Sequence, residues 1–267
     1  MTAFGFIGTG HLGRMLVQKF IETRAMTPEN IIASNRTREE AEHLAKELGI
    51  HVGNNREVAE QSNVTFLCVR PLDIKAVLKE ISEQLTAEKL LVSTAADFSL
   101  RDLEALCQAR VARVVPSLAC ETLLGVSLMA MGDNAAQEDE ALLASLFGAI
   151  GEPIRVEEAH FEVMADLTSC GPGYISALMR EFALAASWKG VPKDLAEELV
   201  KKTLIGTTSL LREESFEGLI SRVATRGGIT EEGIKVIREK SPEMFSELFQ
   251  ASRDKHEAVK RLIEEQD

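Results

Sequence analysis

The sequence predicts an α/β domain built on a parallel sheet, followed by an all-α domain. Up to about residue 156, short apolar runs of strand length alternate with amphipathic helical patterns. After that point the strand-like runs stop and only long helical patterns follow. A glycine-rich turn also follows the first apolar run. We therefore expect one domain over residues 1–156 and a second over residues 157–267.

Composition limits the classes of partner. The chain has 267 residues and a formal net charge of -12, which argues against nucleic acid or an anionic membrane as the main partner. The four cysteines have no metal-like or disulfide-like spacing, so we expect free thiols, no metal site and a cytoplasmic location. We find no leader pattern in "MTAFGFIGTG" and no run of about 20 apolar residues that would span a membrane.

The strand candidates are mostly continuous apolar runs, as expected for strands covered on both faces. Because helical patterns lie between them, we expect parallel pairing with right-handed crossovers. The candidates are Ala3 to Ile7, Ile31 to Ser34, Val64 to Val69, Leu90 to Ser93, Arg113 to Val115 and Val126 to Met131.

Helix signals separate these runs. The stretch "RTREEAEHLAKELG" places apolar residues on one face and ends at Gly49, and "PLDIKAVLKEISEQL" begins at Pro71. Three long helical patterns form the second domain, at residues 158–190, 192–214 and 241–266, with a break at Gly171-Pro172-Gly173 and with Pro242 near the start of the third. Their many apolar residues predict a homodimer or higher homo-oligomer; the alternative is that the helices pack only within one chain.

The first glycines have the G-x-G-x-x-G spacing of a Rossmann dinucleotide-binding turn. Gly8 allows the tight turn, Gly10 lets a pyrophosphate approach the backbone, and Gly13 lets helix and strand pack closely. The amides at the following helix N-terminus suit phosphate, so we expect Thr9, His11 and Leu12 at the cofactor as well. The alternative is a tight turn that binds no ligand.

The end of the second strand indicates which dinucleotide binds. It reads "SNRT", Ser34 to Thr37, with no acid to repel a 2'-phosphate and with Arg36 available to bind one. We therefore expect NADPH, with NADH as the alternative. Arg36 could instead be a solvated residue before a helix.

Further strand ends supply the remaining candidates, because ligands of open α/β sheets bind at the carboxyl ends of strands. Each of these loops could equally be an ordinary turn. The candidates for the cofactor are Val69, Arg70, Pro71, Thr94 and Ala95, and Pro116-Ser117 ends another run.

A second glycine loop, "RVATRGGITEEG", lies near the C-terminus. A double glycine followed by Thr230 predicts a flexible loop feeding a helix N-terminus, where bare amides and the helix dipole favour a small anion. We expect Gly227, Gly228, Ile229 and Thr230 to bind a carboxylate. The two following glutamates are expected to point away from the site.

These pieces together resemble the pyrroline-5-carboxylate reductase family. The matching stretches occur in the family's order across nearly the whole chain: "GFIGTGHLG", "NRT", "FLCVRPLD", "VSTAAD", "RVVPSLA", "SCGPGYI" and "VATRGGITEEG". The resemblance implies a Rossmann domain and a helical domain that forms an intertwined dimer. It also implies NAD(P)H-dependent reduction of the cyclic imine Δ1-pyrroline-5-carboxylate to L-proline, a step of proline biosynthesis.

The resemblance further implies that the Thr230 hydroxyl faces the imine nitrogen, so Thr230 is the candidate catalytic residue; the alternative is that it only caps the helix. Four positions depart from the family's usual residues: Arg226 replaces proline, Cys170 serine, Gly173 alanine and Ser117 asparagine. The pattern is similar to reductase-like proteins encoded in bacterial late-competence operons. Arg226 either strengthens carboxylate binding or points to solvent.

Two other functions compete with this interpretation. Two-domain β-hydroxyacid dehydrogenases use a lysine on the helix entering the second domain, but no lysine lies between Phe161 and Trp188. The other alternative is a diverged NADP-binding paralogue with a competence-related or sensory role and little reductase activity, which Arg226 and Cys170 make credible.

Overall fold

The computed structural model describes residues 3–266, which form two compact units. The sheet unit comprises the chain up to Cys170 together with the segment from Arg253 onward, and the helical unit comprises Gly171–Ser252. The sheet unit extends beyond residue 156 because helix α7 (Phe161–Ala165) and the end of helix α11 (Ile229–Glu264) pack on it. The assignment of NADP binding to residues 1–156 and of substrate binding and dimerisation to residues 157–267 stays a prediction.

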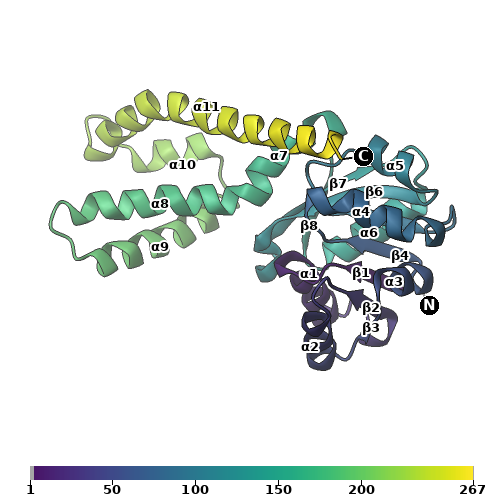
Figure 1. Ribbon diagram of the computed structural model, residues 1–267. Helices are drawn as coiled ribbons and strands as arrows, with labels where there is room; N and C mark the ends of the chain where they lie inside the picture. Colours follow the sequence, from purple (N-terminus) through teal and green to yellow (C-terminus); the bar gives the residue numbers. More distant parts are fainter. Residues whose placement is uncertain (1–2, 267) are drawn as a thin grey trace. The chain divides into compact units, whose positions relative to one another are not determined.

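An eight-stranded sheet has the order β3-β2-β1-β4-β5-β6-β7-β8 (Figure 1). The structure adds two strands that the sequence pattern missed, β3 and β8, which are short or largely exposed. The strands are β1 (Phe4–Ile7), β2 (Ile31–Ser34), β3 (His51–Val52), β4 (Val64–Leu67), β5 (Leu90–Ser93), β6 (Arg110–Pro116), β7 (Gly125–Met131) and β8 (Gly151–Arg155).

The expected parallel pairing is confirmed for every neighbouring pair but one. Strands β6 and β7 are antiparallel, so the expectation was wrong there. Only a short 3₁₀ turn, η4 (Leu118–Thr122), joins them. A connection of this length cannot carry the chain back to the start of a parallel strand, which needs a crossover of a dozen or more residues.

Helices cover both faces of the sheet (Figure 1), and the core accordingly has two clusters. Along β1, Phe4 and Phe6 enter one cluster while Ile7 enters the other. The continuous apolar runs are therefore explained by burial on both sides. The helices of this unit are α1 (His11–Glu22), α2 (Arg38–Leu48), α3 (Asn55–Gln61), α4 (Ile74–Ile81), α5 (Leu100–Leu106), α6 (Gln137–Gly148), α7 and the end of α11.

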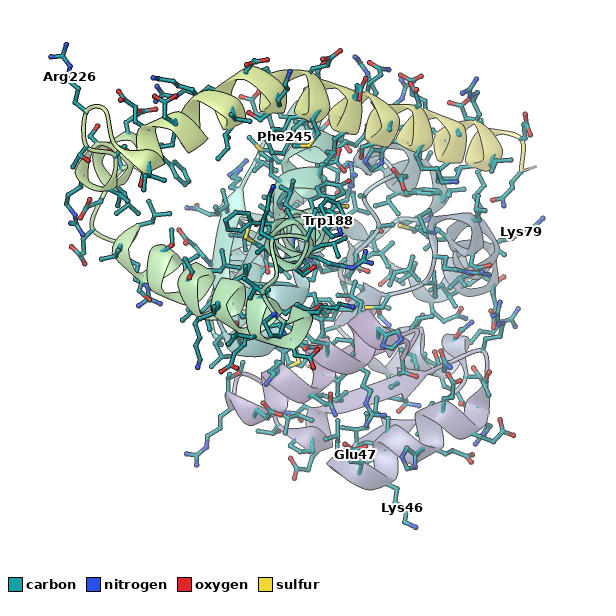
Figure 2. The ribbon with its side chains drawn as sticks, turned by 90° about the vertical axis from the view of Figure 1, so that its left-hand side faces the viewer. Lys46, Glu47, Lys79, Trp188, Arg226 and Phe245 are labelled. Atoms are coloured by element: carbon teal, nitrogen blue, oxygen red, sulfur yellow. The ribbon has the colours of Figure 1, made fainter. Side chains whose placement is uncertain are left out.

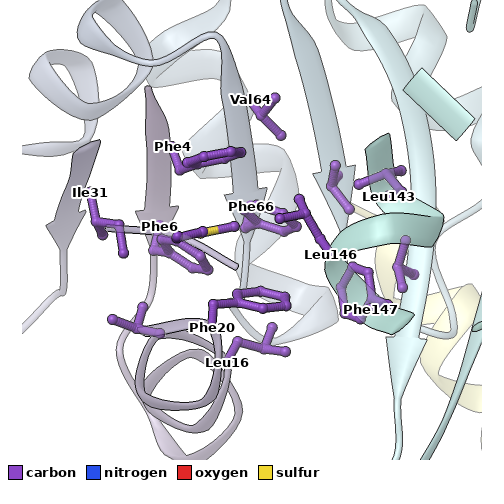
Figure 3. Close-up of a cluster of buried hydrophobic side chains, with 14 of the residues drawn as sticks. Phe4, Phe6, Leu16, Phe20, Ile31, Val64, Phe66, Leu143, Leu146 and Phe147 are labelled. Atoms are coloured by element: carbon purple, nitrogen blue, oxygen red, sulfur yellow. The ribbon is translucent and has the colours of Figure 1, made fainter. Parts of the chain in front are cut away.

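Stacked aromatic rings fill the centre of the first cluster (Figure 3). The rings of Phe6 and Phe66, on neighbouring strands, lie 4.8 Å apart and nearly parallel. Phe147 of α6 meets Phe20 of α1 edge-on at 5.4 Å. Such pairs contribute about 0.5–1.5 kcal/mol beyond the area they bury. These contacts fix α1, and with it the glycine turn, on the sheet.

The helical unit contains α8 (Gly171–Ser187), α9 (Lys193–Leu210), α10 (Phe216–Val223) and the first part of α11. Helices α8 and α9 form a hairpin (Figure 1). The expected break at Gly171-Pro172-Gly173 was wrong, because these three residues belong to α8; a π-helical turn, Asp166–Cys170, lies immediately before them. The helix runs without a break from α7 through this turn into α8, so Pro172, which has no N–H to donate, lies inside a continuous helix just after the π-helical turn.

Helix α11 continues through Pro242 over 36 residues, although the sequence predicted a separate helix beginning there. Proline inside a helix removes one backbone hydrogen bond. No described helix is both long and apolar enough to span a bilayer.

We expect Phe147→Ala to lower the free energy of unfolding by about 3–5 kcal/mol, because it leaves a cavity between fully buried rings. Urea unfolding followed by circular dichroism measures the change. Leu124→Ala is the matched control, since Leu124 is 70% exposed and its truncation should change stability by no more than about 0.5 kcal/mol. Equal effects of the two substitutions would contradict the proposed role of the ring cluster.

Candidate cofactor and substrate sites

The first glycine turn joins β1 to α1 by close backbone contacts. Gly8 has φ 97° and donates its N–H to the Ser34 carbonyl at 2.9 Å. A Cβ at Gly8 would lie 2.5 Å from the Cys68 carbonyl oxygen, and one at Gly13 would lie 2.0 Å from the Gly8 carbonyl oxygen. At Gly10, by contrast, an added Cβ would meet nothing within 4 Å. Gly8 and Gly13 thus serve the fold, while Gly10 leaves open space beside the N-terminus of α1.

A cavity of about 520 Å³ lies at the carboxyl ends of β1, β2 and β4. The structure brings seven of the expected cofactor residues together in its wall: Gly8, Gly10, Asn35, Arg36, Thr37, Val69 and Arg70. The others are chain neighbours of these or lie after β5, and they do not line it: Thr9, His11, Leu12, Ser34, Pro71, Thr94 and Ala95.

Asn35 connects the two loops that form one side of the cavity. Its side-chain oxygen accepts the Thr9 N–H at 3.2 Å, and its amide donates to the Glu40 carboxylate at 2.6 Å. The nearby Thr9 hydroxyl is buried without a hydrogen-bond partner. Buried polar atoms rarely lack partners, so an unpaired hydroxyl in a phosphate-type turn fits a site completed by a ligand.

Sequence reasoning missed Glu40 and Asn55, which also line the cavity. Asn55 accepts a hydrogen bond from the Ser34 hydroxyl at 2.7 Å and donates to Glu80 at 2.8 Å. It begins α3, directly after the helix-capping Asn54. The capping pattern at Asn54 could have predicted the start of α3 from the sequence. That Asn55 lies near β2, however, depends on the pairing of β3 with β2, and β3 was missed.

Two guanidinium groups border the cavity and differ in their partners. Arg70 forms an ion pair with Asp73 at 2.8 Å, which raises the pKa of the arginine. Arg36 is exposed and has no carboxylate partner among residues 3–266. Arg36 is therefore the cation available to a bound phosphate.

The loop after β5 lies beside the end of β4. The Thr94 hydroxyl and N–H both contact the Leu67 carbonyl at 3.2 Å, and Thr94 and Ala95 are buried. Burial raises the pKa of the neighbouring Cys68 thiol to about 12, so it stays protonated at neutral pH. At the end of β6, Ser117 caps η4.

The second glycine loop belongs to the helical unit. Gly227 has φ 73°, and the Gly228 N–H donates to the Thr225 carbonyl at 2.9 Å. The Gly227 N–H donates to the Glu231 carboxylate at 2.7 Å. The expectation that both glutamates point away was therefore wrong for Glu231, whose side chain reaches back over its own helix N-terminus.

Helix α11 begins at Ile229, one residue before the expected start, so Thr230 lies inside the first turn rather than at its cap. The N–H groups of a first turn have no preceding helical carbonyl to bind. Arg226 projects outward at the tip of this loop (Figure 2), as the solvent-facing alternative predicted. Among the described residues, no group of three or more His, Cys, Asp or Glu side chains could hold a metal ion.

The fold and the glycine turn define the class: a Rossmann-type protein with a helical C-terminal part. The family model "NADP oxidoreductase coenzyme F420-dependent" matches residues 3–97, and "Pyrroline-5-carboxylate reductase dimerisation" matches residues 158–259. The chain belongs to the pyrroline-5-carboxylate reductase family, which confirms the resemblance drawn from the sequence motifs.

Individual relatives cover nearly the whole chain. It is 34% identical to ComE operon protein 4 of Bacillus subtilis, over 95% of this chain and 94% of that protein. It is 32% identical to pyrroline-5-carboxylate reductase of Methanosarcina acetivorans, over 88% and 89% of the two chains. The solved structure of a pyrroline-5-carboxylate reductase from Coxiella burnetii is similar with a TM-score of 0.88, at 27% identity over 97% and 98% of the chains.

We expect Gly10→Ala and Gly13→Ala to separate binding from folding. The Gly10 methyl group enters open space, so thermal stability should stay within about 1 kcal/mol of the wild type while the Kd for NADPH rises about tenfold or more. The Gly13 methyl group meets the Gly8 carbonyl, which should destabilise the fold by about 1–3 kcal/mol.

Thermal unfolding and NADPH fluorescence titration measure the two effects. The site assignment fails if Gly10→Ala binds NADPH as tightly as the wild type.

Proposed function

We propose that this protein reduces Δ1-pyrroline-5-carboxylate to L-proline, with NADPH as the hydride donor. The observation that carries the proposal is similarity over nearly the full length to proteins named pyrroline-5-carboxylate reductase, combined with an open glycine turn beside the unpaired Arg36. The substrate is a small imino acid, so an acidic protein needs a local anion site rather than a basic surface.

The sheet unit holds the dinucleotide. The free amides at the start of α1 and the unpaired Thr9 hydroxyl suit the pyrophosphate, and Gly10 lets it approach the backbone. Arg36 pairs with the 2'-phosphate, which favours NADPH over NADH. Glu40 also lines the cavity; a hydrogen bond from the Asn35 amide fixes its carboxylate in place, but the negative charge remains. When bound, the cofactor supplies the hydride; the chain supplies orientation.

The second glycine loop binds the substrate carboxylate. The amides of Ile229 and Thr230 lie in the first turn of α11, and each hydrogen bond to a charged group contributes about 1.5–3 kcal/mol. Gly227 and Gly228 keep the approach free of side chains, although Glu231 already accepts from the Gly227 amide. The helix dipole adds to the attraction for an anion.

Thr230 orients the imine. Its hydroxyl donates a hydrogen bond to the imine nitrogen, which makes the adjacent carbon a better hydride acceptor. A threonine is too weak an acid to supply the proton outright, so it relays a proton from water. Both the hydroxyl and the amide of Thr230 lie in the same first turn, which lets one residue hold the carboxylate and the nitrogen of a compact substrate.

The helical unit forms the homodimer. Large apolar side chains of this unit are exposed within one chain, and residues 158–259 match a dimerisation family. Trp188 (Figure 2), for example, is 74% exposed. Exposed apolar area of this kind is typical of a protein interface. The other exposed apolar residues include Phe182, Ile205, Phe216, Val236 and Ile237.

A cytoplasmic location is part of the proposal, because no disulfide bond joins any of the four cysteines, Cys68, Cys107, Cys120 and Cys170, within the described residues. The alternative of a diverged NADP-binding protein without turnover is not favoured, since several relatives at 28–33% identity are named as reductases. ComE operon protein 4 is the relative that connects the chain to a competence operon by name.

The central test is NADPH oxidation, followed by absorbance, on addition of pyrroline-5-carboxylate. Thr230→Ala should lower kcat about tenfold, the loss of roughly 1.4 kcal/mol for one hydrogen bond to the reacting group. Thr230→Ser keeps the hydroxyl and should retain most of the rate. Tight NADPH binding without turnover of any cyclic imino acid would refute the proposed function.

Cofactor preference is tested separately with Arg36→Ala. Removing the unpaired guanidinium should raise the KM for NADPH about tenfold or more while leaving the KM for NADH within about twofold, because only NADPH carries the 2'-phosphate. Arg70→Ala is the comparison, since Arg70 is already paired with Asp73. If Arg36→Ala raised the KM for NADPH and the KM for NADH by the same factor, Arg36 would not be the residue that recognises the 2'-phosphate.

A further inference from the structure

A histidine in the last turns of α11 lies between two carboxylates. His256 Nδ1 is hydrogen-bonded to Asp97, and His256 Nε2 lies 3.3 Å from Asp166 Oδ1. The His256 and Asp97 side chains are each 14% exposed, and that of Asp166 is 4% exposed. All three residues belong to the sheet unit.

Asp97 lies in the loop between β5 and α5, hereafter the β5–α5 loop (residues 94–99). This loop begins with Thr94 and Ala95, which we expect to adjoin the nicotinamide ring. His256 therefore contacts the loop two residues beyond the expected position of the reactive end of the cofactor. Nothing in the proposed reduction uses this histidine directly.

A buried arginine also holds this loop, from the sheet side. Arg113 of β6 donates to the Ala96 carbonyl and pairs with Glu158 at 2.6 Å. Its guanidinium lies 4.2 Å from the centre of the Phe161 ring and is 3% exposed. Glu158 also accepts the Leu100 N–H at 2.7 Å, at the start of α5. The β5–α5 loop is thus fixed at Ala96 by Arg113 and at Asp97 by His256.

The geometry at His256 indicates its charge state. A neutral imidazole has one N–H, whereas the imidazolium has two. Each ring nitrogen of His256 faces a carboxylate oxygen, and a carboxylate can only accept, so both contacts are hydrogen bonds only when the ring carries both protons. Burial alone would lower the pKa of His256, but the hydrogen bond and charge of Asp97, followed by those of Asp166, outweigh it and raise the pKa.

We propose that His256 is a positioning residue for the reduction: through Asp97 it holds the β5–α5 loop in the conformation that receives the nicotinamide ring. This role rests on the proposed function. His256 touches neither substrate nor cofactor and acts through Asp97. Its contact with Asp166 anchors the imidazolium to the π-helical turn that follows α7.

The other charged groups around His256 are already paired. Lys260, one turn further along α11, pairs with Glu162 of α7, and Arg253 lies 3.6 Å from Glu257 on α11 itself. Arg113 acts on Asp97 from β6. The folded-state pKa of His256 is raised. The contacts of the protonated ring with Asp97 and Asp166 are therefore fully formed below the ordinary imidazole pKa of about 6.5, and they are lost as pH rises through the higher folded-state pKa.

The test compares His256→Asn, Asp97→Asn, the double variant and Lys260→Gln. We expect His256→Asn to lower kcat about tenfold at pH 6 with the Kd for NADPH changed less than about threefold, because phosphate contacts, which this loop does not make, dominate cofactor binding. Asp97→Asn should behave alike, and the double variant should be no worse than the poorer single variant. Lys260→Gln breaks the ion pair between α11 and α7, which includes no residue of the loop, and should stay within about twofold of wild type.

The ratio of wild-type to His256→Asn kcat should fall toward one as pH rises, because the wild-type histidine loses its proton. Hydrogen exchange of amides 94–99 should be faster in His256→Asn and Asp97→Asn than in Lys260→Gln. The proposal is overturned if Lys260→Gln lowers kcat equally, if the kcat ratio is constant with pH, or if loop exchange is unchanged.

Failure of the proposed function gives a different result. The wild type then oxidises no NADPH with any cyclic imine, and loop exchange with and without bound NADPH still decides whether His256 holds the loop for the ring. NADPH protection of amides 94–99 that is present in the wild type and lost in His256→Asn supports the positioning role; protection that persists in the variant overturns it.

Discussion

The close approach of three backbone segments at the β1–α1 turn is the constraint on which the cofactor site depends. The chain at Gly8 passes the Cys68 carbonyl at the end of β4, and α1 passes the Gly8 carbonyl at Gly13, with no room at either place for a Cβ atom. Phe20 of α1 packs in the cluster of phenylalanine rings on the sheet, and this packing holds α1 in the position that these backbone contacts require. Open space therefore remains at Gly10, where a phosphate can meet helix amides.

Charged and polar side chains around this turn form the rest of the candidate cofactor site. Asn35 joins the glycine turn to α2, while Ser34 and Asn55 join β2 to α3. Each buried polar atom in this chain of contacts has a partner except the Thr9 hydroxyl, which lies where the ligand is proposed to bind. In the β5–α5 loop, the buried Arg113 and the part-buried His256 add polar contacts at Ala96 and Asp97 to the apolar packing of Phe98, which is fully buried. Removing one partner of a buried ion pair is strongly destabilising, because it leaves the other charge unpaired.

The second glycine loop, unlike the first, has a backbone amide that is bound by a side chain of its own helix. Its backbone is open, but one of its amides is already bound by the chain's own Glu231. An internal carboxylate on that amide demonstrates that the loop accepts an anionic oxygen, and it also keeps the amide hydrogen-bonded in the absence of substrate. The Gly228 amide is likewise engaged in the turn, so in the proposed substrate site the first-turn amides of α11 are the ones left to bind a carboxylate.

The sequence by itself predicted six of the eight strands in their order, the glycine turn with its distinct glycine roles, and the family, because these depend on local periodicity and on residues whose chemistry allows few substitutes. It did not predict β3, whose two residues are too few for a periodic signal, or the antiparallel β6–β7 pair, whose direction follows from the length of a connection. Asn55, Glu40 and the His256–Asp97–Asp166 cluster were also beyond its reach. Their partners lie up to 159 residues away, and only tertiary packing brings such residues within hydrogen-bonding distance.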